Sequence, residues 1–398
     1  MITAMLLIIK PMTVRFLRTA SLLLLFFIHR VSPAQEKESD LEINGYLSGM
    51  QSTLIEKWSD KWFKESLIHN RLNFKWYASS NFTVDLEVRT RMLFGDFVED
   101  IPGYSLMIDP NQSWSDLSGF VFEKKNFLLH SAIDRAWIDY TAGKFQVRLG
   151  RQRINWGQNF AWNPNDIFNT YSFFDVDYPE RPGSDAVKLQ YYTGVSSLVE
   201  AAVKIDTLRN VTAALKYGFS RWNYDFQVLS GLLNSEDLVL GMGWSGDIKG
   251  AGFRGEFSYF HPKENIADTS GSLIASLGLD YTFKNSLMLQ LEGLYCGTAN
   301  HTANFQEYYY KPLSVKTISF TRWALLLKGS YPVTPLFNTG LSVMYFPTMD
   351  GFFISPDLSY SILDNLSASF MVQYFNAEFT SGIRQKISLG FLRMKFSF

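Results

Sequence analysis

Apolar and polar residues alternate with a period of two through most of the chain after about residue 40, and a helical period is rare. The segment 82–92 is the clearest example, with Phe82 and Val84 on one side and Asp85 and Glu87 on the other. Successive side chains of a strand point to opposite faces of the sheet. The alternation therefore predicts strands that have one apolar face and one polar face.

Eighteen segments fit this pattern and are predicted as strands: 41–50, 68–78, 82–94, 131–140, 144–151, 185–192, 197–205, 210–218, 222–231, 237–245, 250–260, 271–283, 287–296, 319–331, 336–346, 352–362, 365–375 and 386–398. Every second connection is tight: 79–81, 141–143, 193–196, 219–221, 246–249, 284–286, 332–335 and 363–364. The other connections are often long, notably 95–130, 152–184, 261–270, 297–318 and 376–385. Short turns at one end and long loops at the other are typical of a transmembrane barrel.

A soluble β-sandwich also alternates, but its strands average about 5–6 residues. Many of the alternating runs here reach about 9–12 residues, which is the length needed to cross a bilayer at a tilt. A closed sheet also pairs every backbone group, and the lipid interior requires that. The sequence therefore predicts an all-β fold, a single closed antiparallel transmembrane β-barrel of about 18 strands (16–18) over residues 41–398.

The amino-acid composition supports a membrane barrel and argues against nucleic-acid-binding, disulfide-rich and cysteine-rich metal proteins. Aromatic residues make up 16% of the chain and charged residues 19%, and the net charge is −1. Several apolar faces end in an aromatic residue, as at Tyr217, Tyr259 and Trp323, which is expected where side chains meet lipid headgroups. The near-neutral balance gives no indication of nucleic-acid binding. The single cysteine, Cys296, excludes an intrachain disulfide framework and a cysteine-rich metal site.

The N-terminus carries the pattern of a targeting segment. Arg15 and Arg18 precede an apolar core at 20–28, and small residues end the pattern at Ser32-Pro33-Ala34. This order is typical of a cleaved secretory signal peptide. We therefore expect residues 1–34 to be removed and residues 35–40 to form a short N-terminal segment before the barrel. An uncleaved anchor helix is the alternative.

The last strand points to a family. Leu392, Met394, Phe396 and Phe398 share one face, and Arg393 and Lys395 lie opposite. With the signal segment and the alternation, this ending resembles Gram-negative outer-membrane porin-like β-barrel proteins, whose final strand commonly ends in Phe. The resemblance implies location in the cell outer membrane, periplasmic short turns, and contacts with outer-membrane lipids and lipopolysaccharide. It also implies recognition of the C-terminal strand by the barrel-assembly machinery, and it leaves homotrimer and monomer open.

The polar faces of the predicted strands carry more basic than acidic residues. Rings of Arg and Lys in a pore attract anions. The basic residues predicted to line the pore are Arg71, Lys75, Arg89, Arg91, Arg135, Arg148, Lys188, Arg254, Arg322 and Lys328. Two interpretations stand at this point, a mild preference for anionic solutes and a pairing of these charges across strands. A register error of one residue would reverse the contribution of any strand.

The connection 152–184 is the third of the external loops and among the longest. It resembles in position the third loop of general porins, which folds inward and narrows the channel. Its start, Gly150 to Gly157 followed by Asn-Pro-Asn-Asp, also resembles a segment of uncharacterised porin-like barrels. Long ordered loops often carry function. If this loop folds inward, the constriction candidates are Arg151, Arg153, Trp156, Trp162, Asp166 and Arg181. An outward loop that contacts lipopolysaccharide or a neighbouring subunit is the alternative.

Motifs for catalysis and for cofactors are missing from the sequence. The histidines after the signal segment are far apart and lack metal-ligand spacing, and no Gly-rich phosphate loop or Gly-Xaa-Ser-Xaa-Gly motif occurs. We expect no enzyme activity, no metal and no cofactor. An outer-membrane hydrolase is the alternative, and it would use His130 beside Ser131 and Asp134.

The predicted function is an outer-membrane channel for passive diffusion of small hydrophilic solutes, with anions as the preferred class under the first interpretation of the lumen. Two other functions compete with it. One is a transporter or exporter of a specific larger substrate, although residues 35–45 are too few to plug a barrel. The other is a structural or assembly barrel that works with a partner protein.

Overall fold

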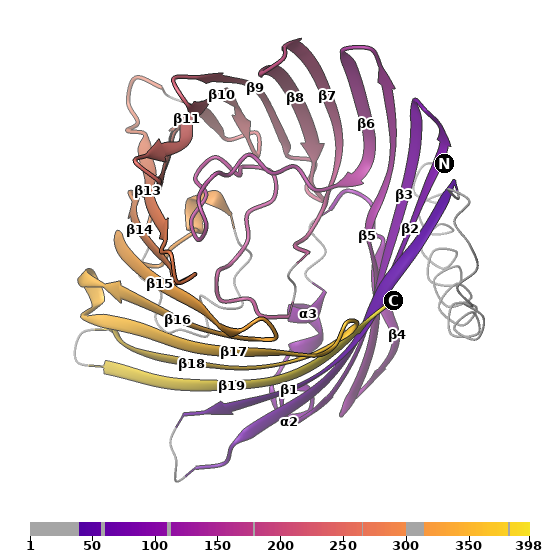
Figure 1. Cartoon of the computed structure of the whole chain (residues 1–398), viewed down its shortest axis with the longest axis vertical. Helices are drawn as coiled ribbons and strands as arrows, with labels where there is room; N and C mark the ends of the chain where they lie inside the picture. The colour runs from indigo at the N-terminus through magenta and orange to yellow at the C-terminus, as the bar shows by residue number, and fades with distance from the viewer. Residues whose placement is uncertain are drawn as a thin grey trace.

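The structure is a computed structural model that describes residues 40–56, 60–109, 113–177, 180–264, 266–299, 314–380 and 383–398. The predicted signal peptide, residues 1–34, lies outside the described residues, as does nearly all of the predicted segment 35–40. Both remain predictions. Within the described ranges the chain is almost entirely strand, and the barrel prediction is confirmed (Figure 1).

The described strands are β1 (Leu41–Ile55), β2 (Phe63–Ser79), β3 (Phe82–Gly95), β4 (Ser118–Lys124), β5 (Phe127–Ala142), β6 (Phe145–Gln152), β7 (Ser184–Gly194), β8 (Ser197–Ile205), β9 (Val211–Arg221), β10 (Tyr224–Leu233), β11 (Asp237–Ile248), β12 (Ala251–Pro262), β13 (Ser272–Thr282), β14 (Met288–Cys296), β15 (Trp323–Thr334), β16 (Phe337–Phe346), β17 (Gly351–Leu363), β18 (Leu366–Thr380) and β19 (Ile383–Ser397). The described helical segments are short: α2 (Asp96–Asp100), α3 (Tyr104–Ile108), η2 (Val315–Thr317) and η3 (Pro347–Met349). Each of the eighteen predicted strands corresponds to one of these strands.

The sheet closes on itself through its first and last strands. β1 pairs antiparallel with β19, with Tyr46 opposite Ser397, and also with β2. Backbone hydrogen bonds between Gly45 and Phe398 in both directions seal the seam at the chain's end. All other neighbours in the ring are antiparallel and consecutive, except that β3 pairs directly with β5. Eighteen strands therefore form the closed barrel, and β4 lies outside the count. Closure leaves no unpaired edge along the ring, as a lipid environment demands.

The connection between β3 and β5 is more ordered than predicted. It contains α2, α3 and β4, where the sequence suggested only a loop. Residues 127–132 of β5 pair with β3 on one edge and with β4 on the other, and β6 pairs with that second edge only from Ala136 onward. β4 therefore covers the part of β5 that β6 leaves open. The sequence did not predict this pairing, because β4 has only 7 residues and its partner is the following strand, β5.

Two predicted loop regions are wrong. Residues 376–385 are not a long loop, because β18 runs to Thr380 and Thr380 pairs with Ile383 at the start of β19. Likewise, β1 and β2 extend well into the segment between 50 and 68. The predicted tight turns are present at one end of the barrel. Lys249 and Gly250, for example, both have positive φ (54° and 87°), as a two-residue type I′ hairpin requires.

Side chains alternate between the lumen and an apolar outer surface. On β15, Trp323, Leu325 and Leu327 are 51%, 49% and 50% exposed, whereas Ala324 and Leu326 are 0% and 1% exposed. Exposed large apolar residues recur in this way around the ring, including the predicted outward face of β19. Such a belt is stable only against lipid. No helix of the described ranges has both the length and the apolar character to cross a membrane.

Candidate functional site: the inward loop and the lumen

Residues 153–183 connect β6 to β7. The described parts of this segment, 153–177 and 180–183, which we call the inward loop, run inside the barrel (Figure 1). Its contacts follow the inner wall around the ring. The Trp156 indole donates to Glu200 on β8, and the backbone N–H of Trp162 donates to Glu292 on β14. Further along, Gln373 on β18 donates to the Phe174 carbonyl, and Arg393 on β19 donates to the Val176 carbonyl. The alternative of an outward loop is therefore wrong.

Two buried carboxylates hold the first half of the inward loop. Glu256 on β12 accepts hydrogen bonds from the backbone N–H groups of Gln158, Asn159 and Asn165. Glu292 on β14 accepts from those of Phe160, Ala161 and Trp162. Each glutamate is 1% exposed. Six donors of an irregular segment are thus satisfied by the wall instead of by a helix or a strand.

The wall opposite this segment carries small residues. A Cβ atom built on Gly241 of β11 would lie 2.7 Å from the Asn165 Oδ1 atom, and one on Gly278 of β13 would lie 2.9 Å from the Asn159 Oδ1 atom. Ser276 of β13 accepts from Asn159 and donates to the Trp162 carbonyl at 2.9 Å. Side chains larger than Gly or Ser at these lumen-facing positions would push the loop away from β11–β13.

Behind the inward loop the barrel interior is apolar. Ile154, Trp156, Phe168 and Phe174 pack against lumen-facing residues of the strand wall in one buried cluster that also contains Phe320. The wall contributes Leu229, Phe260, Ile274, Leu294, Leu326, Met344, Phe353 and Phe375. The assumption that the polar face of each strand is the inner face is therefore wrong for these positions. Apolar residues face inward here because the loop shields them from water.

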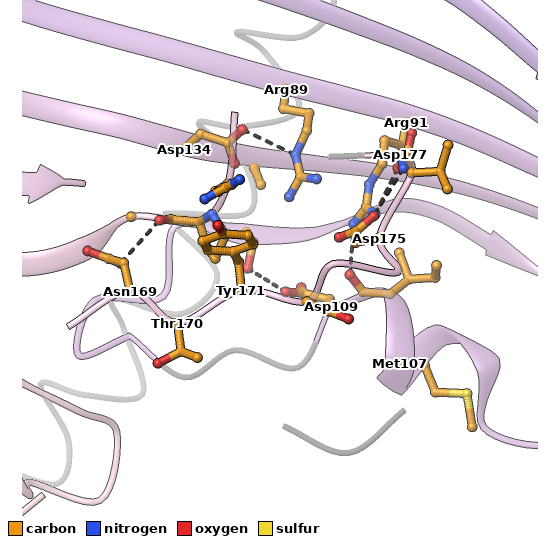
Figure 2. A pocket seen from close by; sticks show the side chains of 18 of the residues that line it. Arg89, Arg91, Met107, Asp109, Asp134, Asn169, Thr170, Tyr171, Asp175 and Asp177 are labelled. Atoms are coloured by element: carbon orange, nitrogen blue, oxygen red, sulfur yellow. Dashed lines mark hydrogen bonds and ion pairs between the residues drawn. The ribbon is translucent and has the colours of Figure 1, made fainter. Parts of the chain in front are cut away.

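The other half of the lumen is open and charged (Figure 2). A cavity of about 1700 Å³ lies between the inward loop, α3 and the inner faces of β1, β2, β3, β5 and β19, and it also reaches residues of β8, β10, β14 and β15. Arg89 Nε lies 3.3 Å from Asp134 Oδ2 on this wall, and Arg91 Nη1 lies 3.8 Å from Asp177 Oδ2 of the inward loop. His130 Nε2 lies 3.3 Å from Asp109 Oδ2 at the end of α3. Cationic and anionic groups therefore alternate along the cavity wall.

A β-bulge brings Asp134 into this cluster. The register of β3 against β5 shifts between Glu87 and Val88, so that Asp134 has no partner residue in the ladder. Both Asp134 and its neighbour Arg135 are buried in the lumen as a result, although consecutive strand residues normally face opposite sides. Asp134 then pairs with Arg71 at 2.5 Å. The sequence analysis missed this carboxylate because strict alternation places it on the outer face.

Most of the predicted pore-lining residues have partners. Arg71 also pairs with Glu87, Arg148 with Asp139 at 2.9 Å, and Arg254 with Asp280 at 2.8 Å. Arg135 donates to the backbone carbonyls of Asp134, Glu180 and Arg181. Pairing across strands, the second interpretation of the sequence, thus describes Arg71, Arg89, Arg148 and Arg254, whereas Arg91 pairs with the inward loop and Arg135 bonds backbone carbonyls.

The four remaining predicted residues differ from these arginines. Lys75 lies over the Tyr77 ring at 5.0 Å. Lys188 and Lys328 are half-buried on inward-facing positions, and within the described chain neither has a carboxylate oxygen within 4.0 Å. Arg322 is exposed and precedes β15 instead of lying on it, so its assignment to strand 319–331 is wrong.

The six constriction candidates separate into three positions. Arg151 lies at the base of the inward loop and pairs with Asp185. Trp156 and Trp162 are buried in the packed half, where they anchor the loop. Arg153, Asp166 and Arg181 belong to the start, the middle and the return segment of the loop, and both arginines lie over the Tyr171 ring.

Two loop carboxyls have displaced pKa values. Burial raises the pKa of Asp166 to about 7, against the lowering effect of the Arg153 charge. Burial also acts to raise the pKa of Asp177, but the hydrogen bond with His69 and the charges of Arg91 and Arg89 outweigh it and hold that pKa at about 2. Asp177 is therefore ionised over the physiological range and ties the loop to β2 and β3.

The residues of the alternative hydrolase site do not assemble in the described structure. His130 contacts Arg91 and Asp109, whereas the neighbouring Ser131 Oγ lies 3.3 Å from Thr90 Oγ1. Nucleophilic catalysis needs the base within hydrogen-bond reach of the nucleophile. Nor does any group of three or more His, Cys, Asp or Glu side chains in the described ranges have the geometry to hold a metal ion.

Comparisons with known proteins agree with this architecture. No family model matches the chain, and no curated protein matches it. Among solved structures, Pseudomonas aeruginosa OccK11 (OpdR) aligns with a TM-score of 0.55 at 9% identity, over 90% of this chain and 96% of that one. Acinetobacter baumannii OccAB4 gives 0.56 at 9% identity over 92% and 100% of the two chains, and OccAB1 of the same organism gives 0.53 at 11% over 92% and 99%. The protein therefore has the fold of the Gram-negative outer-membrane porins, and its apolar belt agrees with that location.

Proposed function

We propose that this protein is an outer-membrane channel for the passive diffusion of small hydrophilic solutes. The observation that carries the proposal is the cavity of about 1700 Å³ that an inward loop leaves open beside a charged wall, inside a closed barrel with an apolar outer surface. A barrel of this strand number is wide enough to hold water and solute. The packed half of the lumen narrows the passage, which favours small solutes over polymers.

A weak preference for anions is the finer part of the proposal. The arginines of the cavity wall are neutralised by neighbouring carboxylates, so they add little net charge. Lys188 and Lys328 face the lumen without such a neighbour in the described chain. Together with Lys204, which lines the cavity and donates to the Phe168 carbonyl, these cationic groups raise the local anion concentration modestly.

Reconstitution into planar bilayers tests the proposal. We expect discrete conductance steps from detergent-purified, heat-modifiable protein, and none from the same sample after boiling. Liposome swelling should then show faster entry of small sugars and organic acids than of oligosaccharides. Folded protein that gives neither conductance nor swelling would contradict the channel, and it would favour a structural barrel instead.

A further inference from the structure

The segment 158–165 has an unusual hydrogen-bonding arrangement inside the lumen. It forms no helix or strand, and six of its eight residues donate their backbone N–H groups to Glu256 or Glu292. These bonds span 91 to 132 residues of sequence. The loop therefore takes its backbone geometry from two side chains of the barrel wall.

The chemistry of the carboxylate suits this task. A carboxylate offers only acceptors, on two oxygens, whereas an amide of the same shape replaces one oxygen by a donor. Glu256 uses both oxygens, Oε1 for Gln158 and Asn159 and Oε2 for Asn165 at 3.1 Å. Glu292 also uses both, Oε2 for Phe160 and Ala161 and Oε1 for Trp162 at 2.7 Å.

Glu256 and Glu292 are so deeply buried that they depend on the loop for their hydrogen-bond donors. A carboxylate that is 1% exposed is costly unless its oxygens are hydrogen-bonded. If the loop left the wall, both glutamates would lose their donors, and six backbone N–H groups would lose their acceptors. Docking of the loop and burial of the two acids are therefore mutually dependent.

The structure assigns Glu256 and Glu292 as positioning residues: they hold the inward loop against β12–β14 and so keep the other half of the lumen open as the solute passage. The assignment rests on the proposed channel function, because it gives the loop position a consequence for permeation. On this view the two acids set the size limit of the pore without contacting the solute. Loosening them releases the loop into the open half, so that the pore fluctuates and closes intermittently.

Graded variants test the assignment. Glu256→Gln and Glu292→Gln each lose at least one of three acceptor contacts, and Glu256→Ala and Glu292→Ala lose all three. We expect open-channel noise and closing events to increase from wild type to Gln to Ala. Amide hydrogen exchange at the affected loop residues should quicken by roughly fivefold for each hydrogen bond lost.

A matched control uses Asp139→Ala. Asp139 on β5 is also a buried lumen carboxylate, but its hydrogen bonds come from Gln146, Arg148 and Thr141 of the barrel and not from the inward loop. We expect its exchange pattern at 158–165 to match wild type. Unchanged noise and unchanged loop exchange in both alanine variants would overturn the assignment, as would equal effects in the control.

A covalent tether separates loop position from general stability. In a Cys296→Ala background, Asn159→Cys and Gly278→Cys place two thiols on facing residues, because a Cβ atom on Gly278 would lie 2.9 Å from the Oδ1 atom of the Asn159 side chain that is replaced. Mass analysis under non-reducing conditions shows whether the two thiols form a disulfide. Added to Glu256→Ala, the oxidised pair should restore steady current, and reduction should abolish the rescue. A formed disulfide that leaves the noise unchanged would refute the positioning role.

The hydrogen-exchange measurement also separates this assignment from the proposed function. If wild-type protein carried no current, the channel proposal would fail, and exchange at 158–165 would still report whether the two acids hold the loop. Heat-modifiable migration of each variant shows that its barrel is folded. If an alanine variant loses that migration, its barrel is not folded, and the glutamine variants and the disulfide tether then test the assignment.

Discussion

Arg151 and Asp185 close the base of the inward loop with a two-point ion pair, in which Arg151 Nε lies 2.7 Å from Oδ1 and Nη2 lies 3.1 Å from Oδ2. The same two residues hold Ser115 of the β3–β5 connection, because Arg151 donates to its carbonyl and Asp185 accepts from its N–H. One planar guanidinium thus ties two external segments to neighbouring strands. The pair lies where the loop leaves the wall.

Replacement of Arg151 should therefore destabilise the barrel more than a surface change does. Arg151→Ala leaves a nearly buried carboxylate without its partner, which costs about 3 kcal/mol. Arg151→Lys keeps the charge but not the two-point geometry, and it should cost less. The temperature at which the band of folded protein disappears in gel electrophoresis measures the loss of stability in both variants. Arg221→Ala, at the exposed end of β9, is the control and should not shift that temperature.

A charge on the outer face should impair membrane assembly. Leu327 on β15 is 50% exposed and faces outward, between the inward Leu326 and Lys328. Leu327→Arg should cost about 2–4 kcal/mol near the bilayer centre. Folding yield into lipid vesicles checks this, with Val195→Arg in a tight turn as the control. Equal yields for the two variants would argue against a lipid-facing surface on β15.

Ion selectivity should depend on the two lumen lysines. Lys328→Glu reverses a charge on the cavity wall, so anion permeability relative to cation permeability should fall by roughly twofold. Lys188→Glu reverses an inward charge on β7 that does not line the cavity, and it should have a smaller effect in the same direction. Reversal potentials in a salt gradient give this ratio. Lys249→Glu lies in the exposed β11–β12 turn and should leave it unchanged. A wild-type channel that prefers cations would contradict the proposed anion preference.

Acid should weaken the contact of the inward loop with β2 and β3. The pKa of Asp177 is held at about 2, below the ordinary value near 4 for Asp. Its contribution to loop docking is therefore fully present above about pH 4 and is lost as the pH falls through about 2. Because Asp166 titrates near pH 7, the quantity to compare is the difference in current noise between wild type and Asp177→Asn, which should stay constant down to about pH 5 and shrink in stronger acid. Asp177→Asn should be noisier than wild type at neutral pH and should lack the step in acid.

The barrel could be predicted because its strands follow a local rule. Leu392, Met394, Phe396 and Phe398 alternate with Arg393 and Lys395, and the former are exposed on the outer surface as expected. Every second side chain of a strand faces lipid, and the others face water or the inward loop. The alternation of apolar and polar residues in one sequence therefore identifies the outer and the inner face. The same rule failed at the Asp134 bulge, where one inserted residue shifts the alternation.

The route of the inward loop could be expected only from resemblance, and its anchors could not be predicted. Glu256 and Glu292 read in the sequence as ordinary polar-face residues, and nothing local links them to residues 158–165. Weak signals were present, since Gly241 and Gly243 of β11 and Ser276 and Gly278 of β13 are small residues on inward positions of the two strands that flank β12. They indicate that a segment approaches this wall, but not which segment.

The chain's own pattern was thus sufficient for eighteen strands, their outward faces and the closure of the ring, because each depends on neighbours in sequence or on the adjacent strand. Folding in three dimensions settled the division of the lumen into a packed half and an open half, the pairing of the arginines, and the two carboxylates that hold the loop. Those features arise from contacts between residues about a hundred positions apart, and such contacts leave no periodic trace along the chain.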